Sequence, residues 1–173
     1  LDTGEEHAIG FDEDAYELSI QSGYEFGAAI LRFTYSSMTT PQRVFDYHMN
    51  TRDRTLRKEQ EVPSGHDAAQ YVTRRLFAES HDGAIVPISV LHRKDIKLDG
   101  SAPLLLYGYG SYGMAMPASF VTNRLSLVDR GFVYAIAHIR GGTEKGYGWY
   151  LDGTLEKKRN TFLDFIAAGE HLT

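Results

Sequence analysis

The sequence lacks cysteine entirely, although it has 173 residues. Disulfide bonds, cysteine nucleophiles and zinc–thiolate sites are therefore excluded. Long apolar runs are also missing, because no stretch approaches the roughly 18–20 residues that span a bilayer. The chain opens on an acidic stretch, whereas a secretory signal peptide has a basic segment followed by an apolar one. From these absences we expect a cytoplasmic protein with no membrane partner.

Basic residues are absent from the first 31 positions, which hold eight acidic ones. Over the whole chain, 18 Lys and Arg against 23 Asp and Glu give a formal net charge of −5. A general nucleic-acid binder usually presents a net basic face, so we expect no nucleic-acid partner. The acidic stretch is most simply a solvated edge, and the alternative is an acidic rim that attracts basic ligands. The seven His residues show no metal-binding spacing such as H-E-x-x-H, so we expect no metal site.

Short strands dominate the first third of the chain. The pattern predicts five of them, at 7–11, 16–20, 28–35, 43–49 and 55–62. Their spacing of about ten residues indicates part of a β-propeller blade, a sandwich or a barrel. The turn-forming residues Pro63-Ser64-Gly65-His66-Asp67 then mark a candidate linker.

The remainder of the chain alternates strands with helices. Strands are predicted at 71–79, 84–92, 104–107 and 132–139, and helices at 120–129 and 160–172. Asp82-Gly83 is a strong hairpin signal, because this pair accommodates the positive φ of a tight turn. The last helix is predicted to have Asn160 as its N-cap and an apolar stripe of Phe162, Phe165, Ile166 and Leu172. Such alternation indicates an α/β fold with a parallel or mixed sheet covered by helices.

A glycine-rich segment follows the apolar strand at 104–107. Gly108, Gly110 and Gly113 satisfy the pattern G-x-G-x-x-G, so an oxidoreductase that binds NAD or NADP is one alternative function. The fingerprint requires these glycines to open a helix that holds the pyrophosphate. Pro117 interrupts any helix that starts there, which argues against this alternative.

No serine in this chain carries a nucleophile signature. Ser111 comes nearest to the elbow G-x-S-x-G, but Tyr109 stands where the first glycine is required. Ser80-His81-Asp82 contains the residue types of a catalytic triad in a row, yet triads are spatial, so we interpret the segment as a hairpin turn. What remains is a glycine-rich loop at the carboxyl end of a strand, where ligand sites of open α/β sheets lie. There a phenol of Tyr109 or Tyr112 can donate a hydrogen bond to a developing oxyanion, and simple packing is the alternative role.

Three segments carry a family resemblance: LLLYGYGSYG (104–113), NRLSLVDRGFVYAIAHIRGG (123–142) and GWYLDGTLEKKRNTFLDF (148–165). Together they closely resemble the prolyl oligopeptidase family of serine peptidases, and above all its oligopeptidase B branch. Upstream, FTYSSMTTPQRVFDY (33–47) resembles the end of that family's β-propeller.

The resemblance implies an α/β fold in which residues 1–66 are the last strands of a β-propeller domain and residues 67–173 begin an α/β-hydrolase domain. It also implies hydrolysis of short peptides after Arg or Lys through an acyl-enzyme, with no cofactor. Tyr109 matches the tyrosine whose hydroxyl completes the family's oxyanion hole. Tyr112 matches the aromatic residue that lines the primary specificity pocket in prolyl-specific members.

Two features depart from the family pattern. The family's nucleophile lies in a GGSxGG elbow after the helix predicted at 160–172, and α/β-hydrolases order their triad Ser, Asp, His. We therefore expect the 173 residues to hold no triad member and to be inactive on their own. Some oligopeptidase B enzymes carry an acidic pair where this sequence has Pro117 and Ser119, which weakens the case for a dibasic preference. Besides the NAD(P) alternative, a non-catalytic β-rich interaction module is the other function left open.

Overall fold

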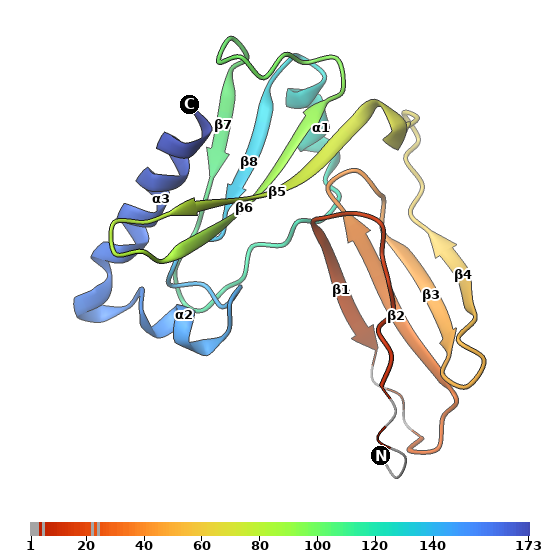
Figure 1. Ribbon diagram of the computed structural model, residues 1–173. Helices are drawn as coiled ribbons and strands as arrows, with labels where there is room; N and C mark the ends of the chain where they lie inside the picture. Colours follow the sequence, from red (N-terminus) through yellow and green to blue (C-terminus); the bar gives the residue numbers. More distant parts are fainter. Residues whose placement is uncertain (1–3, 5, 22, 24) are drawn as a thin grey trace.

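The computed structural model describes residues 4, 6–21, 23 and 25–173. In this part of the chain, eight strands form two sheets that follow one another, ordered β1-β2-β3-β4 and β5-β6-β8-β7 (Figure 1). The strands of the first sheet are β1 (Tyr16–Gln21), β2 (Ile30–Ser37), β3 (Arg43–His48) and β4 (Arg54–Glu59). Those of the second sheet are β5 (Tyr71–Glu79), β6 (Ile85–Arg93), β7 (Leu104–Tyr107) and β8 (Val133–Ala137).

The first sheet is an antiparallel meander. Its register places Phe33 of β2 opposite Phe45 of β3, and such cross-strand aromatic pairs stabilise a ladder. Phe33, Tyr35 and Tyr47 form the buried core of this sheet, whereas β1 and β4 are exposed along their whole length. The four strands predicted after residue 15 are therefore confirmed, with small shifts at their ends.

The segment before β1 is held by side-chain contacts and not by backbone hydrogen bonds to a neighbouring strand. The strand predicted at 7–11 is wrong, because this segment is unpaired and Phe11 stacks on Tyr35 with ring centroids 4.8 Å apart. Farther along, the partly buried carboxylate of Glu13 accepts four hydrogen bonds from hydroxyl groups. The donors are Tyr35, Ser37 (2.5 Å), Thr39 (2.6 Å) and Thr40 (2.9 Å). Burial alone raises the pKa of Glu13, but the hydroxyl donors outweigh it and hold that pKa below its ordinary value.

The second sheet is mixed. β5 and β6 form a hairpin, β6 runs antiparallel to β8, and β7 runs parallel to β8 with Leu104 opposite Val133. Two of its strands, β5 and β7, have the bounds predicted from the sequence. A parallel pair needs a crossover, and here the crossover contains helix α1 (Thr122–Val128).

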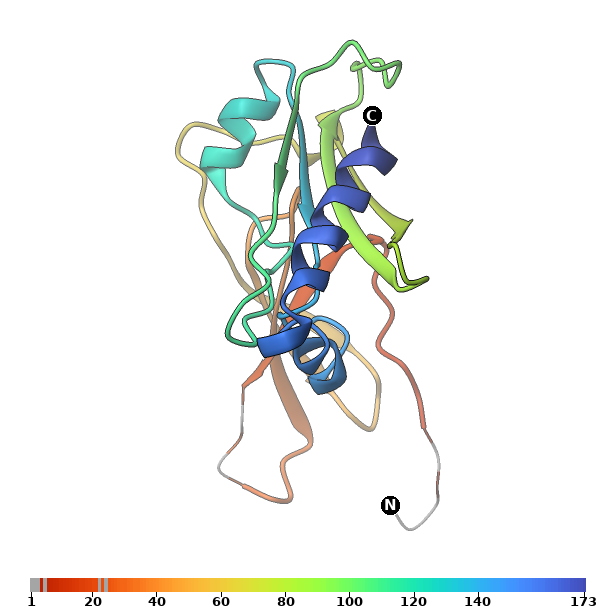
Figure 2. The same cartoon turned by 90° about the vertical axis from the view of Figure 1, so that its left-hand side faces the viewer.

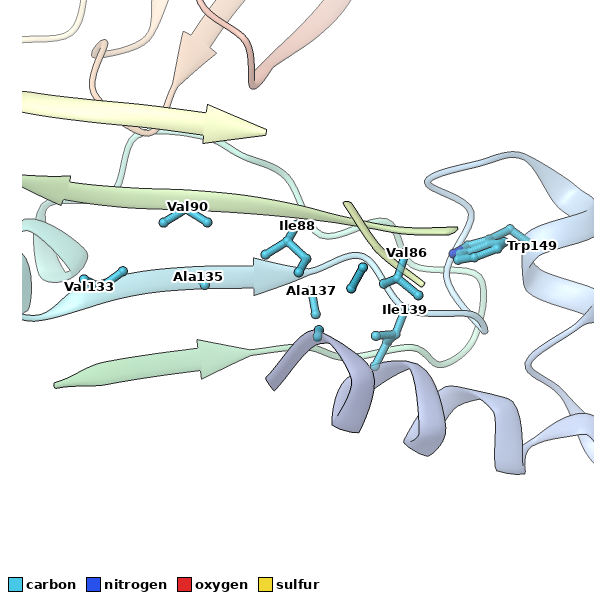
Figure 3. Packing of buried hydrophobic residues seen from close by; sticks show 10 residues of the cluster. Val86, Ile88, Val90, Val133, Ala135, Ala137, Ile139 and Trp149 are labelled. Carbon is cyan, nitrogen blue, oxygen red and sulfur yellow. The ribbon is translucent and has the colours of Figure 1, made fainter. Parts of the chain in front are cut away.

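Helices pack on both faces of the second sheet, and the alternation along β8 shows how. Val133, Ala135 and Ala137, labelled in Figure 3, belong to a buried cluster. The same cluster includes Ala168 of α3 (Arg159–Leu172). Tyr134 belongs instead to the cluster that contains Leu125 and Val128 of α1. Figure 2 shows α1 and α3 on either side of β7 and β8. All five residues of β8 are buried, as expected for a strand covered on both faces.

The last helix differs from its prediction in two ways. Its N-cap is Lys158, so the prediction of Asn160 is wrong; Asn160 lies inside α3 and its side-chain amide donates to the carbonyl of Asp152 over 3.0 Å. The predicted apolar stripe is also only half buried, because Phe162 and Ile166 are 62% and 53% exposed. The residues of α3 that are buried are Thr161, Asp164 and Ala168. A short helix that the sequence did not predict, α2 (Tyr147–Leu151), precedes it.

The two sheets share one of the buried clusters. Ala15 and Met38, from the side of the first sheet, pack with Leu91 of β6 and with Phe120 ahead of α1. The amide of Phe120 also donates to the hydroxyl of Ser36 over 3.0 Å. The predicted break at 63–67 forms a turn and leads into a single turn of 3₁₀-helix at Ala68–Gln70. None of the helices in the described residues could span a membrane.

Replacing Glu13 with Gln in the full-length protein should lower the free energy of unfolding at pH 7 by about 1–2 kcal/mol. This lies low in the range for hydrogen bonds to charged groups because the carboxylate is only partly buried. Since the folded-state pKa of Glu13 is lowered, its stabilisation is present above the unfolded-state pKa of about 4.3 and is lost as the pH falls through the folded value. Urea denaturation at pH 7 and pH 3 measures both effects.

Glu17→Gln is the matched control, because Glu17 lies nearby on the exposed strand β1. It should leave the unfolding midpoint unchanged at both pH values. A difference between wild type and Glu13→Gln that persists undiminished at pH 3 would contradict the assigned role of the carboxylate.

Candidate functional site

The glycine loop, residues 108–113, lies at the carboxyl end of β7. It carries Tyr109, which is 40% exposed, and Tyr112, which is 86% exposed. Tyr112 has a φ of 56°, in the left-handed region that residues other than glycine rarely adopt. Both predicted site residues therefore lie on one loop, and both present part of their ring to solvent. Backbone strain of this kind concentrates at functional sites.

A second loop, residues 138–146, follows the parallel neighbour β8, so the two loops meet at the same edge of the sheet. The amide of Gly113 donates to the carbonyl of Gly141 over 3.0 Å. The hydroxyl of Thr143 donates to the carbonyl of Gly113 over 2.8 Å. The carboxyl ends of parallel strands are where α/β sheets bind their ligands, and this pair of loops occupies that position.

Gly110, the middle glycine of the pattern G-x-G-x-x-G, serves close packing against the loop that contains Gly141 and against α3. A Cβ on Gly110 would lie 2.5 Å from the methyl group of Thr161, and a Cβ on Gly141 would overlap the carbonyl oxygen of Gly110. A pyrophosphate site requires a helix that begins directly at the glycines. Here the segment after Gly113 is not helical, and α1 begins only at Thr122. Nothing in the arrangement of this loop favours the NAD(P) alternative.

Arg140 of the 138–146 loop lies in a buried network of charges. Its Nε and Nη2 donate to the two carboxylate oxygens of Asp164 over 2.8 and 2.6 Å, and its Nη1 donates to Asp82 over 2.5 Å. Asp164 is fully buried and also accepts from the hydroxyl of Ser80 over 2.6 Å. Hydrogen bonds to Asp164 raise the pKa of Arg140, and the guanidinium lowers the pKa of Asp82 to about 2. Arg140 and Asp82 therefore stay ionised across the whole range of ordinary pH.

The network also settles the role of Ser80-His81-Asp82. This segment forms the turn between β5 and β6, as predicted, with the amide of Gly83 donating to the carbonyl of Ser80 over 2.9 Å. Ser80 is buried and its hydroxyl is engaged by Asp164, so it is not available as a nucleophile. Sequence reasoning missed the network itself, because its members are up to 82 residues apart and follow no local spacing.

A second buried group, also missed from the sequence, joins Ser89, His138 and Glu144. The hydroxyl of Ser89 lies 2.7 Å from Nε2 of His138, whose Nδ1 lies 3.7 Å from the Glu144 carboxylate. That carboxylate accepts the amide hydrogen of Met116 over 2.9 Å. These are the residue types of a triad, but Ser89 is fully buried, so no substrate reaches its hydroxyl. The group fixes the segment that follows the glycine loop.

A cavity of about 460 Å³ lies beside that segment, between β1 and β5. Pro117, Met116, His138 and Glu144 are among its lining residues. Ser119 lies shortly after Pro117 in the same segment. Its backbone carbonyl accepts a hydrogen bond from the guanidinium of Arg124 over 2.9 Å, and this contact stabilises the local backbone. Within the described part of the chain, no cluster of three or more His, Asp or Glu side chains is placed to hold a metal ion.

Residues 118–173 match the sequence model of the prolyl oligopeptidase family. The chain is 45% identical over 170 residues to a dipeptidyl aminopeptidase BI of Pseudoxanthomonas mexicana, covering 98% of this chain and 23% of that protein. It is 37% identical over 169 residues to a protease 2 of Moraxella lacunata, covering 98% and 24%. The chain thus spans about a quarter of the length of these relatives.

Solved structures give the same result. Oligopeptidase B of Leishmania major superimposes with a TM-score of 0.85 at 42% identity, over 94% of this chain and 23% of that one. Prolyl oligopeptidase B of Galerina marginata, solved with a bound 35mer substrate, superimposes with a TM-score of 0.79 at 28% identity, over 92% and 22%. The relatives and solved structures that match are peptidases by name. The family to which these matches assign the chain is the prolyl oligopeptidase family.

Replacing Asp164 with Ala should destabilise the full-length protein by about 3–5 kcal/mol, because it leaves the guanidinium of Arg140 buried with only Asp82 as a carboxylate partner. The shift of the urea unfolding midpoint measures the loss. Asp95→Ala is the control, because it removes an exposed carboxylate that also pairs with an arginine, Arg93, at 3.0 Å. Equal midpoints for the two variants would show that the buried pair does not hold this region together.

Proposed function

We propose that the full-length protein is a serine-type oligopeptidase that hydrolyses short peptides after Arg or Lys through an acyl-enzyme. The observation that carries the proposal is the placement of Tyr109 on a tightly packed loop at the carboxyl end of a parallel strand, with part of its ring exposed. A phenol held there donates to the oxyanion of a tetrahedral intermediate without having to reorganise during the reaction. The family of the chain and the names of its relatives support the reaction class.

The domain assignment is part of the same proposal. Residues 1–66 form the last strands of a β-propeller, which is supported by the four-stranded antiparallel meander. Residues 67–173 begin an α/β-hydrolase domain, which is supported by the parallel pair β7–β8 and by helices on both faces of the second sheet. In such a domain the serine, the aspartate and the histidine of the triad come later in the chain than these elements.

Tyr112 is proposed as a contact for the substrate. It is the most exposed aromatic side chain of the glycine loop, at 86%, and its backbone lies in the left-handed region with a φ of 56°. The substrate class proposed is short peptides, and the 35mer bound to the relative from Galerina marginata supports a peptide ligand for a member of this family.

Replacing Tyr109 with Phe in the full-length enzyme should lower kcat by about 10²–10³, the typical effect of losing one oxyanion donor. KM for an arginyl substrate should change little, because the hydroxyl acts in the transition state. Tyr147→Phe is the matched control, since it removes an exposed phenol hydroxyl outside the glycine loop and keeps the ring. An unchanged kcat in Tyr109→Phe would show that the hydroxyl is not the oxyanion donor.

The polypeptide 1–173, produced alone, should not turn over an arginyl fluorogenic peptide, because it contains neither the proposed nucleophile nor the base. The full-length protein should cleave the same peptide, and a serine-directed inhibitor should abolish the cleavage. Lysyl and prolyl peptides of the same length measure the specificity. Turnover by 1–173 that the inhibitor abolishes would overturn the assignment of the triad to a later part of the protein.

A further inference from the structure

Lys158 spans the gap between helix α3 and the glycine loop. Its ammonium donates to the carbonyl of Gly110 over 2.5 Å and lies 3.0 Å from the hydroxyl oxygen of Ser111. The neighbouring Lys157 behaves differently: it is exposed and pairs with the carboxylate of Asp152 at 2.7 Å. Among the described residues, no carboxylate lies within ion-pairing distance of Lys158, so its ammonium is engaged by the loop alone.

The backbone around Tyr109 needs a contact of this kind, which anchors it from outside the loop. Tyr109 stands between Gly108 and Gly110, and glycine has the widest conformational freedom of any residue. On one side, the ladder of the sheet ends at Tyr107, which is opposite Ile136. On the other side, the carbonyl of Gly110 is the next backbone group that a charged side chain holds. The two anchors therefore bracket Gly108 and Tyr109, the two residues that place the phenol.

The contact is suited to this task on physical grounds. A hydrogen bond from an ammonium group is stronger than one between neutral groups, and partial burial increases the advantage. Burial also lowers the pKa of Lys158. The ammonium of Lys158 also lies 6.0 Å from the ring centroid of Phe162 on the next turn of α3, within reach of a cation–π contact. Lys158 thus transmits the position of a rigid helix to a loop that has little rigidity of its own.

We propose that Lys158 is a positioning residue for the oxyanion donor: by holding the Gly110–Ser111 peptide it fixes the direction of the Tyr109 hydroxyl. This inference rests on the proposed function of Tyr109. It assigns to Lys158 a role in kcat and none in contacting the substrate.

The test is a double-mutant cycle in the full-length enzyme with an arginyl fluorogenic peptide. Lys158→Met should lower kcat at least about 10-fold with little change in KM, because only the orientation of the donor is lost. Lys157→Met, the matched control, should keep the wild-type kcat. Lys158→Arg, which retains a charged donor, should recover part of the loss. If Lys158→Met does not fold, Lys158→Gln takes its place.

The decisive comparison is made in the Tyr109→Phe background, where Lys158→Met should have no further effect on kcat because there is no hydroxyl left to orient. The same factor of loss in both backgrounds would overturn the inference, as would a kcat for Lys158→Met equal to that of Lys157→Met. Failure of the proposed function looks different, because Tyr109→Phe would then leave kcat unchanged on its own.

Discussion

The buried pair of Arg140 and Asp164 is the interaction on which the second half of the structure depends. Two opposite charges removed from water are stable only when each has its full set of partners, so their geometry is narrowly constrained. Asp164 comes from α3, Arg140 from the loop that follows β8, and Asp82, the third member, from the turn between β5 and β6. One network therefore sets the rotation of a helix, the path of a loop and the position of a hairpin.

The same network determines the geometry of the glycine loop. Once Asp164 faces the sheet, Thr161 faces it as well, and its hydroxyl donates to the carbonyl of Arg140 over 2.7 Å. Gly141, which follows Arg140, packs its backbone against the backbone of Gly110. This contact leaves no room for a side chain at either position. The pairing of Arg140 with Asp164 therefore positions the glycine loop, which carries Tyr109, through the backbone contact between Gly141 and Gly110.

Whether a feature of the fold or the site can be predicted from the sequence depends on how far apart in the sequence its interacting residues lie. The bounds of β5 and β7 follow from local patterns, namely alternation and an apolar run, and the turn at Asp82-Gly83 follows from turn chemistry. The stripe on α3 was only half right, because the helix turns Asp164 inward to meet a partner 24 residues away and leaves Phe162 outside. Tyr109 and Tyr112 are predicted as site residues from the glycine-rich motif and the family resemblance, and their roles stay predictions. The network of Arg140 and the contact of Lys158 were not, since both are set by tertiary distances.

The glycine loop shows how one pattern of residues can serve two kinds of site. In a dinucleotide fold the glycines let backbone approach a phosphate, whereas here Gly110 lets it approach Gly141 and Thr161. In the proposed function, the chemistry belongs to the side chain of Tyr109 between the glycines and not to the backbone amides. A flexible glycine on each side of Tyr109 gives poor support to a group that must be oriented before it reacts. The rigidity therefore has to come from contacts outside the loop. In the proposed arrangement, Lys158 at the start of α3 and Arg140 in the loop after β8 supply this rigidity, so that a loop rich in glycine can carry an oriented phenol.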